Sequence, residues 1–394
     1  MPDVFTIAEI LVSHAVRMHG DEIAIVAYYG SHAKGLASPT SDLDIFYIPD
    51  EGKASSLSSQ FVVNDLPYDF WPVSWELAED IANARGTRPW AVAASLIADA
   101  KAVYHRSQQD LDRFNALKAR IAELTRPESR PTMLARALEE FKNTLFQLGQ
   151  MRSAMVSDDK AGMHWASLKL VNSAINCLAL VNQTYFTKGW GANLSQALAM
   201  PRKPAGLERR IRAILVSQDP APDPSQVLEE AEQLAQAVRD ILRTAQASIA
   251  EPAAAQEVFK DFYFFVVEYK HKILSACQRA DVIAAGYAAF YLQEELCQLL
   301  NKVENGFYST DLNLLGEYAG GYERAGFPDL LEPASRGDLE TLARRVRRLD
   351  EKVQEWLESQ SIELNILDSE EDLRRFLEHR DGGEPSLGAS TPLS

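Results

Sequence analysis

One stretch near the N-terminus decides the fold of this 394-residue chain, and it reads Ile23-Ala-Ile-Val-Ala-Tyr-Tyr-Gly30-Ser31-His-Ala-Lys-Gly35-Leu-Ala-Ser-Pro-Thr-Ser41-Asp42-Leu43-Asp44-Ile-Phe-Tyr-Ile48. An apolar run typical of a β-strand ends in a small-residue turn, and a polar loop leads to a second apolar run that begins with Asp-Leu-Asp. Side chains two residues apart in a strand point to the same face, so Asp42 and Asp44 are expected to project side by side. Two such carboxylates can share a hard cation such as Mg²⁺, and the Gly30-Ser31 turn offers N–H groups and a hydroxyl to phosphate oxygens.

This combination resembles the signature of the DNA polymerase beta-like nucleotidyltransferase superfamily, in which an apolar strand, Gly-Ser, a loop and Asp-x-Asp/Glu follow one another. The matching residues are Gly30, Ser31, Gly35, Ser41, Asp42, Leu43 and Asp44. A surface hairpin with solvated acids is the alternative. It does not explain two carboxylates at the start of an apolar strand, where their repulsion requires a cation or strong hydrogen bonds.

The resemblance implies roles for these residues. Asp42 and Asp44 are expected to hold metal, and Gly30 and Ser31 to bind the β- and γ-phosphates of a nucleotide. Ser41 either bonds to a phosphate or shapes the turn. His32 also lies in this loop and is interpreted as incidental.

The superfamily usually has a third carboxylate on a later strand, and the resemblance makes Asp69 the candidate. It lies among aromatic residues in Leu66-Pro-Tyr-Asp-Phe-Trp-Pro-Val73, as an inward carboxylate on a short strand would. A simple strand-edge acid is the alternative. Asp65 belongs to an Asn-Asp turn and is interpreted as structural. In the superfamily the third acid completes a two-metal site or serves as the general base.

The charge balance limits the possible partners. The chain has 56 acidic and 40 basic residues and a formal charge of −16, which disfavours binding to nucleic acid backbones. Cys177, Cys277 and Cys297 lie in apolar helical stretches without paired spacing and are expected to be buried free thiols. No secretory signal and no membrane-spanning run is evident, so we expect a cytoplasmic protein.

The expected fold class is α+β, in two parts. Residues 1–109 are expected to form a nucleotidyltransferase-type mixed sheet with helices, and residues 110–380 a large all-α helical bundle, with a division into two sub-bundles near 216–225. Residues 381–394 have turn composition and are expected to be a disordered tail. Within the bundle, periodic apolar residues predict helices over 110–124, 132–155, 160–183, 207–215, 226–248, 253–280, 282–303, 338–360 and 370–379.

A helical bundle after such a catalytic domain resembles the antibiotic nucleotidyltransferases of the kanamycin and streptomycin type. The segment from Leu180 to Trp190, followed by the Pro-containing segment from Leu198 to Pro204, is similar to the helical region of those enzymes. Because related enzymes use a glutamate of the helical domain that faces the cleft, the resemblance makes Glu140 a second candidate for the general base, after Asp69. Plain solvated surface is the alternative for Glu140.

Together these resemblances imply a magnesium-dependent nucleotidyltransferase with one or two ions. It would transfer a nucleoside monophosphate from a nucleoside triphosphate, with ATP as the expected donor, to a hydroxyl of a small-molecule acceptor of the aminoglycoside kind. Two alternatives remain open: modification of a protein partner, as in toxin–antitoxin systems, and a non-catalytic nucleotide-binding module. The sequence gives no indication of the oligomeric state.

Overall fold

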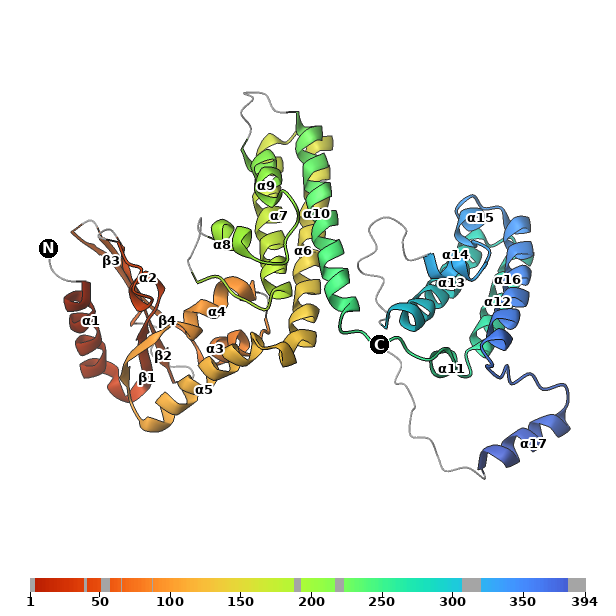
Figure 1. Cartoon of the computed structure of the whole chain (residues 1–394), viewed down its shortest axis with the longest axis horizontal. Coiled ribbons are helices and arrows are strands. Elements are labelled where there is room, and N and C mark those ends of the chain that lie inside the picture. Colours follow the sequence, from red (N-terminus) through yellow and green to blue (C-terminus); the bar gives the residue numbers. More distant parts are fainter. Residues whose placement is uncertain are drawn as a thin grey trace. The chain divides into compact units, whose positions relative to one another are not determined.

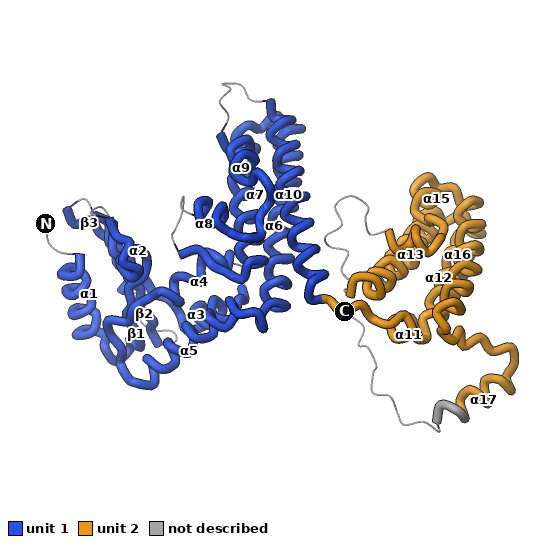
Figure 2. The backbone as a smooth tube through the Cα atoms, in the orientation of Figure 1, with its two compact units in different colours: residues 1–249 blue, residues 250–394 orange. Residues whose placement is uncertain are grey.

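The computed structural model describes residues 4–38, 41–50, 57–64, 66–86, 88–187, 193–216, 223–306 and 320–381. The chain forms two compact units, residues 1–249 and 250–394 (Figure 2). Several predictions concern residues outside the described ranges: the Asp65 turn, the stretch around Trp190, and the tail after Asp381. Asp381 itself ends a helix. The predicted domain limit at residue 109 stays a prediction; the boundary between the two units falls at 249/250, and both sides of 216–225 belong to the first unit.

Unit 1 begins with a five-stranded mixed sheet in the order β3-β4-β2-β1-β5 (Figure 1). Its strands are β1 (Ile23–Tyr28), β2 (Leu43–Pro49), β3 (Ser59–Val63), β4 (Leu66–Pro72) and β5 (Lys101–His105). β1 runs antiparallel to β2 and β5, β3 runs antiparallel to β4, and β2 runs parallel to β4. The predicted α+β class is therefore confirmed, and all five strands described lie within the segment predicted for the sheet.

The two faces of the sheet pack differently because side chains alternate along each strand. On one face, Leu43, Ile45 and Tyr47 join Tyr68 and Phe70 in an apolar cluster that α1 (Val4–His19) completes. The opposite face carries Phe46, whose ring centroid lies 6.2 Å from that of Phe114 in α5 (Gln108–Leu124). Asp42 and Asp44 share the parity of Phe46, so they project from the face opposite α1.

Helices follow the sheet through the rest of unit 1. They are α3 (Trp75–Ala82), α4 (Trp90–Ala98), α5, α6 (Arg130–Val156), α7 (Lys160–Val181), α8 (Asn193–Ala199), α9 (Leu207–Leu215) and α10 (Pro224–Ala247). Their starts are set by capping side chains. Ser107 accepts the Asp110 N–H at 3.2 Å to begin α5, and Asp159 accepts the Gly162 N–H at 2.9 Å to begin α7. The short α8 was not predicted, because about two turns give little periodicity.

Among its described residues, unit 2 contains helices and the segments that connect them, and no strand. Its helices are α11 (Ala255–Val258), α12 (Tyr263–Gln278), α13 (Val282–Asn305), α14 (Gly320–Arg324), α15 (Leu331–Ser335), α16 (Leu339–Ser359) and α17 (Glu370–Asp381). The single helix predicted over 253–280 is wrong: it is divided into α11 and α12. Asp261 between them has a left-handed φ of +59°, which interrupts the helical hydrogen bonds.

Candidate active site

The predicted carboxylates come together through strand pairing. In the parallel β2–β4 ladder, Asp44 is the register partner of Asp69. Paired residues of adjacent strands point to the same face of a sheet, and Asp42, directly before β2, is near enough for its charge to raise the pKa of Asp44. The structure thus brings Asp42, Asp44 and Asp69 to one end of one face of the sheet. Gln60 on β3 borders this group, with its Nε2 atom 3.4 Å from Oδ1 of Asp69.

The Gly-Ser pair lies directly against this group. After β1, the Tyr29 N–H donates to the Asp44 carbonyl at 3.1 Å. Gly30 then has a φ of +75°, and a Cβ atom built on it would lie 2.5 Å from Oδ2 of Asp44. The turn predicted here is a single helical turn, α2 (Gly30–Ala33); it was missed because four residues carry no periodic signal. Only glycine fits this conformation and this space.

Ser41 and His32 shape the loop between α2 and β2. The Ser41 hydroxyl oxygen accepts the Ser38 N–H at 2.8 Å, and the Ser41 carbonyl oxygen lies 3.3 Å from His32 Nε2. Of the two roles considered for Ser41, these contacts correspond to shaping the turn. The His32 ring also packs edge-on against Phe5 of α1 at 5.6 Å.

The electrostatics of the site reflect crowded negative charge. Burial, together with the neighbouring charges of Asp42 and Asp69, raises the pKa of the Asp44 carboxyl to about 6, although His32 and Lys34 act to lower it. Burial and the Asp44 charge also raise the pKa of the Tyr29 hydroxyl well above its usual range. A carboxylate in such surroundings is stabilised by a cation.

The donor chemistry fits Mg²⁺ in one specific sense. Among the described residues, no group of three or more His, Cys, Asp or Glu side chains is arranged to hold a metal ion, so the three carboxylates do not form a complete ligand set as they stand. Mg²⁺ is usually held in proteins by one or two carboxylates, and water and substrate phosphates supply its other ligands. The adjacent Asp42 and Asp44 carboxylates, with Asp44 short of compensating charge, match that requirement.

The comparison with known protein families identifies the helices that follow the sheet. Residues 111–248, which run from α5 to the end of α10, match the family described as "KNTase C-terminal domain". This part of the chain is similar to the C-terminal domain of the kanamycin nucleotidyltransferase family. The match ends at residue 248, close to the end of unit 1, so unit 2 lies outside it.

Other comparisons add less. A nucleotidyltransferase-like protein from Exiguobacterium sibiricum 255-15 is similar in structure, with 12% identity and a TM-score of 0.36 over 63% of this chain and 84% of that protein. None of the curated proteins compared matches the chain. In the described residues, no helix combines the length and the apolar character needed to span a bilayer.

Sequence reasoning missed a contact that ties the loop after β1 to the helices. Lys34 follows α2, and its Nζ atom lies 3.2 Å from Oδ2 of Asp99 at the end of α4; both side chains are largely buried. Lys34 also donates to the Thr187 carbonyl, and the Tyr185 hydroxyl donates to Oδ1 of Asp99 at 3.2 Å. The only feature of the sequence that could have indicated this contact is the position of Lys34 in the same loop as Gly30 and Ser31.

Glu140 lies in a different place from the three aspartates. It is 7% exposed in α6, within the helical part of unit 1, which rules out plain solvated surface. Burial raises the pKa of its carboxyl to about 7, although Arg136, Asn143 and Asn176 lower it. These neighbours all belong to α6 and α7, and none of the sheet carboxylates is among the groups that shift the pKa of Glu140.

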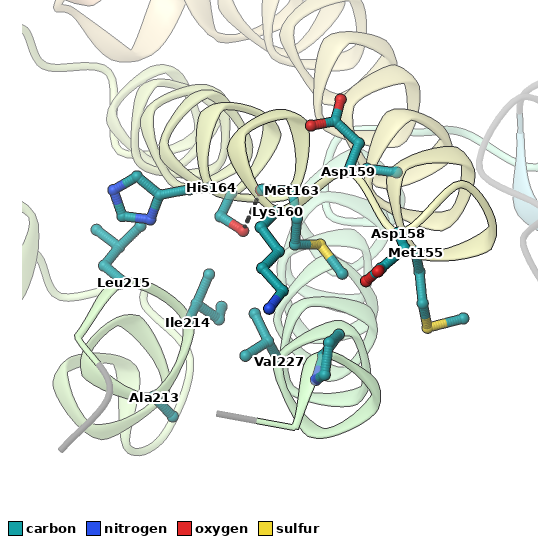
Figure 3. Close-up of a pocket in the computed structure, with 13 residues that line it drawn as sticks. Met155, Asp158, Asp159, Lys160, Met163, His164, Ala213, Ile214, Leu215 and Val227 are labelled. Atoms are coloured by element: carbon teal, nitrogen blue, oxygen red, sulfur yellow. Dashed lines mark hydrogen bonds between the residues drawn. The ribbon is translucent and has the colours of Figure 1, made fainter. Parts of the chain in front are cut away.

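A cavity of about 520 Å³ lies farther along the helices, where α6 meets α7 beside α9 and α10 (Figure 3). Met155, Met163, Ile214 and Val227 give it an apolar lining, and the Lys160 side chain points between Ile214 and Val227. None of the lining residues comes from the sheet. It is therefore a separate feature from the carboxylate site on the sheet.

Proposed function

We propose that this protein is a magnesium-dependent nucleotidyltransferase that transfers a nucleoside monophosphate from a nucleoside triphosphate to a hydroxyl of a small-molecule acceptor. The observation that carries the proposal is the register pairing of Asp44 with Asp69 on the face where Gly30 lies against Asp44. The KNTase C-terminal domain over residues 111–248 supports it, since that domain follows the sheet directly.

The proposed roles follow from the positions of these side chains. Asp42 and Asp44 would hold the ion, and Asp69 would join a second ion or act as the base. An ion held by these residues would supply neutralisation of the triphosphate oxygens and of the charge that develops on pyrophosphate. Gly30 leaves room for close approach of the β- and γ-phosphates, and Ser31 in the same turn offers a hydroxyl.

In the proposed step, the acceptor hydroxyl oxygen forms a bond to the α-phosphorus while the bond from that phosphorus to the bridging oxygen breaks. Pyrophosphate leaves, and the hydroxyl proton passes to a carboxylate. Asp69 is the first candidate for this base because it lies beside Asp44. Glu140 is the second: its pKa of about 7 suits a base at neutral pH, but its neighbours lie in the helices.

For the acceptor we propose a cationic small molecule of the aminoglycoside kind, and for the donor ATP in the cytoplasm. The formal charge of −16 favours attraction of a cation over that of an anion. It also disfavours nucleic acid as the acceptor.

The test is direct. Purified protein is incubated with Mg²⁺, α-labelled triphosphates of each base and a panel of aminoglycosides. We expect a labelled acceptor and an equal amount of pyrophosphate with at least one pair, and loss of both in Asp42→Asn. Absence of transfer to every acceptor, with label found instead on a co-expressed protein by intact-mass measurement, would favour the protein-modifying alternative.

A further inference from the structure

Unit 2 exposes a row of large apolar side chains on α13, which we call the aromatic face. It comprises Ile283, Tyr287, Phe290 and Tyr291, which are 69%, 64%, 44% and 51% exposed. Their spacing of three and four residues places them on one side of the helix. The other side of α13 is already used: Ala285, Leu292 and Leu296 are buried in the core of the unit.

The aromatic face continues onto the neighbouring helix α12. The ring centroid of Tyr291 lies 6.5 Å from that of Tyr269, and the ring centroid of Tyr269 lies 4.4 Å from that of Phe265. On α13 itself, Tyr291 lies 5.7 Å from Phe290. Because these rings already pack against one another, their rotamers are restricted before any partner binds. A large exposed apolar patch with fixed side chains is typical of a protein interface.

Charges of opposite sign lie at the two ends of this face. Glu294 and Glu295 follow it toward the end of α13, and neither has an ion-pair partner among the described residues. Burial and the charge of Glu294 raise the pKa of the Glu295 carboxyl. At the other end, Arg279 lies in the turn before α13, donates only to the Ser275 hydroxyl and faces no carboxylate in the described part of the chain. Asp281 in the same turn is occupied as the cap of α13, where it accepts the Ala284 N–H at 3.0 Å.

We propose that the aromatic face is a homodimer interface, on which α13 of a second copy of this chain packs antiparallel about a two-fold axis near Tyr287. Ile283 and Tyr291 lie four residues before and after Tyr287, so each contacts the other on the opposite copy. The same axis brings the Arg279 end of one copy to the Glu294–Glu295 end of the other, twice. A self-complementary patch is what a two-fold interface requires.

This arrangement selects a second copy over an unrelated partner. An apolar patch alone would accept many helices. Here the patch has a basic end, an aromatic centre and an acidic end, so two antiparallel copies place each basic end opposite an acidic end. The face lies in unit 2 (Figure 2) and outside the KNTase C-terminal domain, so the proposal does not depend on nucleotide transfer.

The first experiment measures the mass of the full-length chain in solution by light scattering coupled to gel filtration. We expect twice the 43.8 kDa of one chain. Tyr287→Lys brings two like charges together at the axis and should give a monomer with an unchanged circular dichroism spectrum. Phe146→Lys is the matched control, because Phe146 is also an aromatic residue on a helix surface, 61% exposed in unit 1, and it should leave the dimer intact.

The second experiment tests the pairing of the two ends by sedimentation equilibrium. Arg279→Glu and Glu295→Arg each place like charges opposite one another at both symmetric contacts, and each should weaken dimerisation by about tenfold. The double variant Arg279→Glu/Glu295→Arg should restore it. A monomeric wild-type chain at micromolar concentration, or a dimer that Tyr287→Lys leaves intact, would overturn the proposal. A dimer lost in Tyr287→Lys but not rescued by the double variant would overturn the antiparallel arrangement.

Discussion

Gly30 and Asp44 are so close that a methyl group added to Gly30 would lie 2.5 Å from the Asp44 carboxylate oxygen Oδ2. The two residues belong to neighbouring elements, α2 and β2, which the Tyr29 N–H and the Asp44 carbonyl also join. A small residue is therefore required here for two reasons. The backbone is left-handed, and the space beside it is already taken by a carboxylate assigned to metal binding in the proposed function.

A comparison of Gly30→Ala with Gly35→Ala distinguishes the effect of the left-handed backbone from the effect of the crowded space. Gly35 has a similar φ of +69°, but nothing lies within 4 Å of a Cβ built on it. Both variants should lose about 1 kcal/mol of stability from backbone strain. Only Gly30→Ala should displace Asp44, with a further loss of stability and a fall in transfer of about a hundredfold. Urea unfolding measures the stability of each variant, and initial rates measure its transfer activity. Equal activity of the two variants would show that the space beside Gly30 does not matter for the position of Asp44.

Asp44→Asn should stabilise the protein and abolish its activity. The folded-state pKa of Asp44 is about 6, above the ordinary value of 3.8. Its contribution to stability is therefore fully present below the ordinary value and lost as the pH rises through about 6. In metal-free buffer, the melting temperature of Asp44→Asn should exceed that of the wild type near pH 8 and equal it near pH 4.

A second measurement on Asp44→Asn links the stability change to the proposed chemistry. Mg²⁺ with a nucleoside triphosphate should raise the melting temperature of the wild type, because a ligand that binds only the folded state stabilises it. Asp44→Asn should show little of this rise. An equal rise in both proteins would exclude Asp44 from the binding site.

The sequence predicted the local parts of this site well. Alternation along β2 placed Asp42 and Asp44 on one face, because a strand has a fixed period of two. The prediction that Asp69 joins them had to come from a resemblance, since the parallel pairing of β2 with β4 depends on contacts between residues far apart in the chain. Glu140 shows the opposite limit. Its helix was predicted from periodicity, but its burial depends on how α7 packs against α6, which no local pattern records.

The missed contact of Lys34 with Asp99 has the same physical origin. The two residues are separated by most of the sheet domain in sequence, yet their charged atoms lie 3.2 Å apart. Neither residue stands out locally, because a lysine in a loop and an aspartate at a helix end are both common surface features. The break between α11 and α12 was missed for a different reason: Asp261 enters a left-handed conformation within an otherwise helical pattern.

The Lys34–Asp99 pair should contribute to stability as a coupled unit. We expect Lys34→Met and Asp99→Asn each to destabilise unit 1, and a double-mutant cycle to give a coupling energy of about 1 kcal/mol, because both side chains are largely buried. Tyr185→Phe should cost less, since it removes one hydrogen bond to Asp99. Urea unfolding of the four cycle members gives the coupling. A value near zero would show that the pair does not tie the loop to the helices.

Glu140→Gln should remove the loss of stability that the wild type shows as the pH rises from about 4.5 through about 7. The folded-state pKa of Glu140 is about 7, against an ordinary value of 4.5, and burial is the largest cause. Because the raised value favours the protonated form, the stability contributed by Glu140 is complete below pH 4.5 and is lost as the pH rises through about 7. Near pH 8 the loss amounts to roughly 3 kcal/mol for a shift of this size.

Glutamine keeps the shape of the protonated acid and adds N–H donors, and the buried Asn176 Oδ1 atom has no hydrogen-bond partner in the described structure. We therefore expect Glu140→Gln to match the wild type near pH 5 and to exceed its free energy of unfolding near pH 8. Glu139→Gln is the matched control: Glu139 is the preceding residue, its side chain is 56% exposed, and it pairs with Lys142 at 3.1 Å, so its variant should follow the wild-type pH profile. Urea unfolding at both pH values decides the matter, and parallel profiles for Glu140→Gln and the wild type would show that the Glu140 carboxyl titrates normally. If Glu140→Gln shows this gain in stability near pH 8 and also loses transfer while binding nucleotide as before, Glu140 takes part in the reaction, and it replaces Asp69 as the first candidate for the general base.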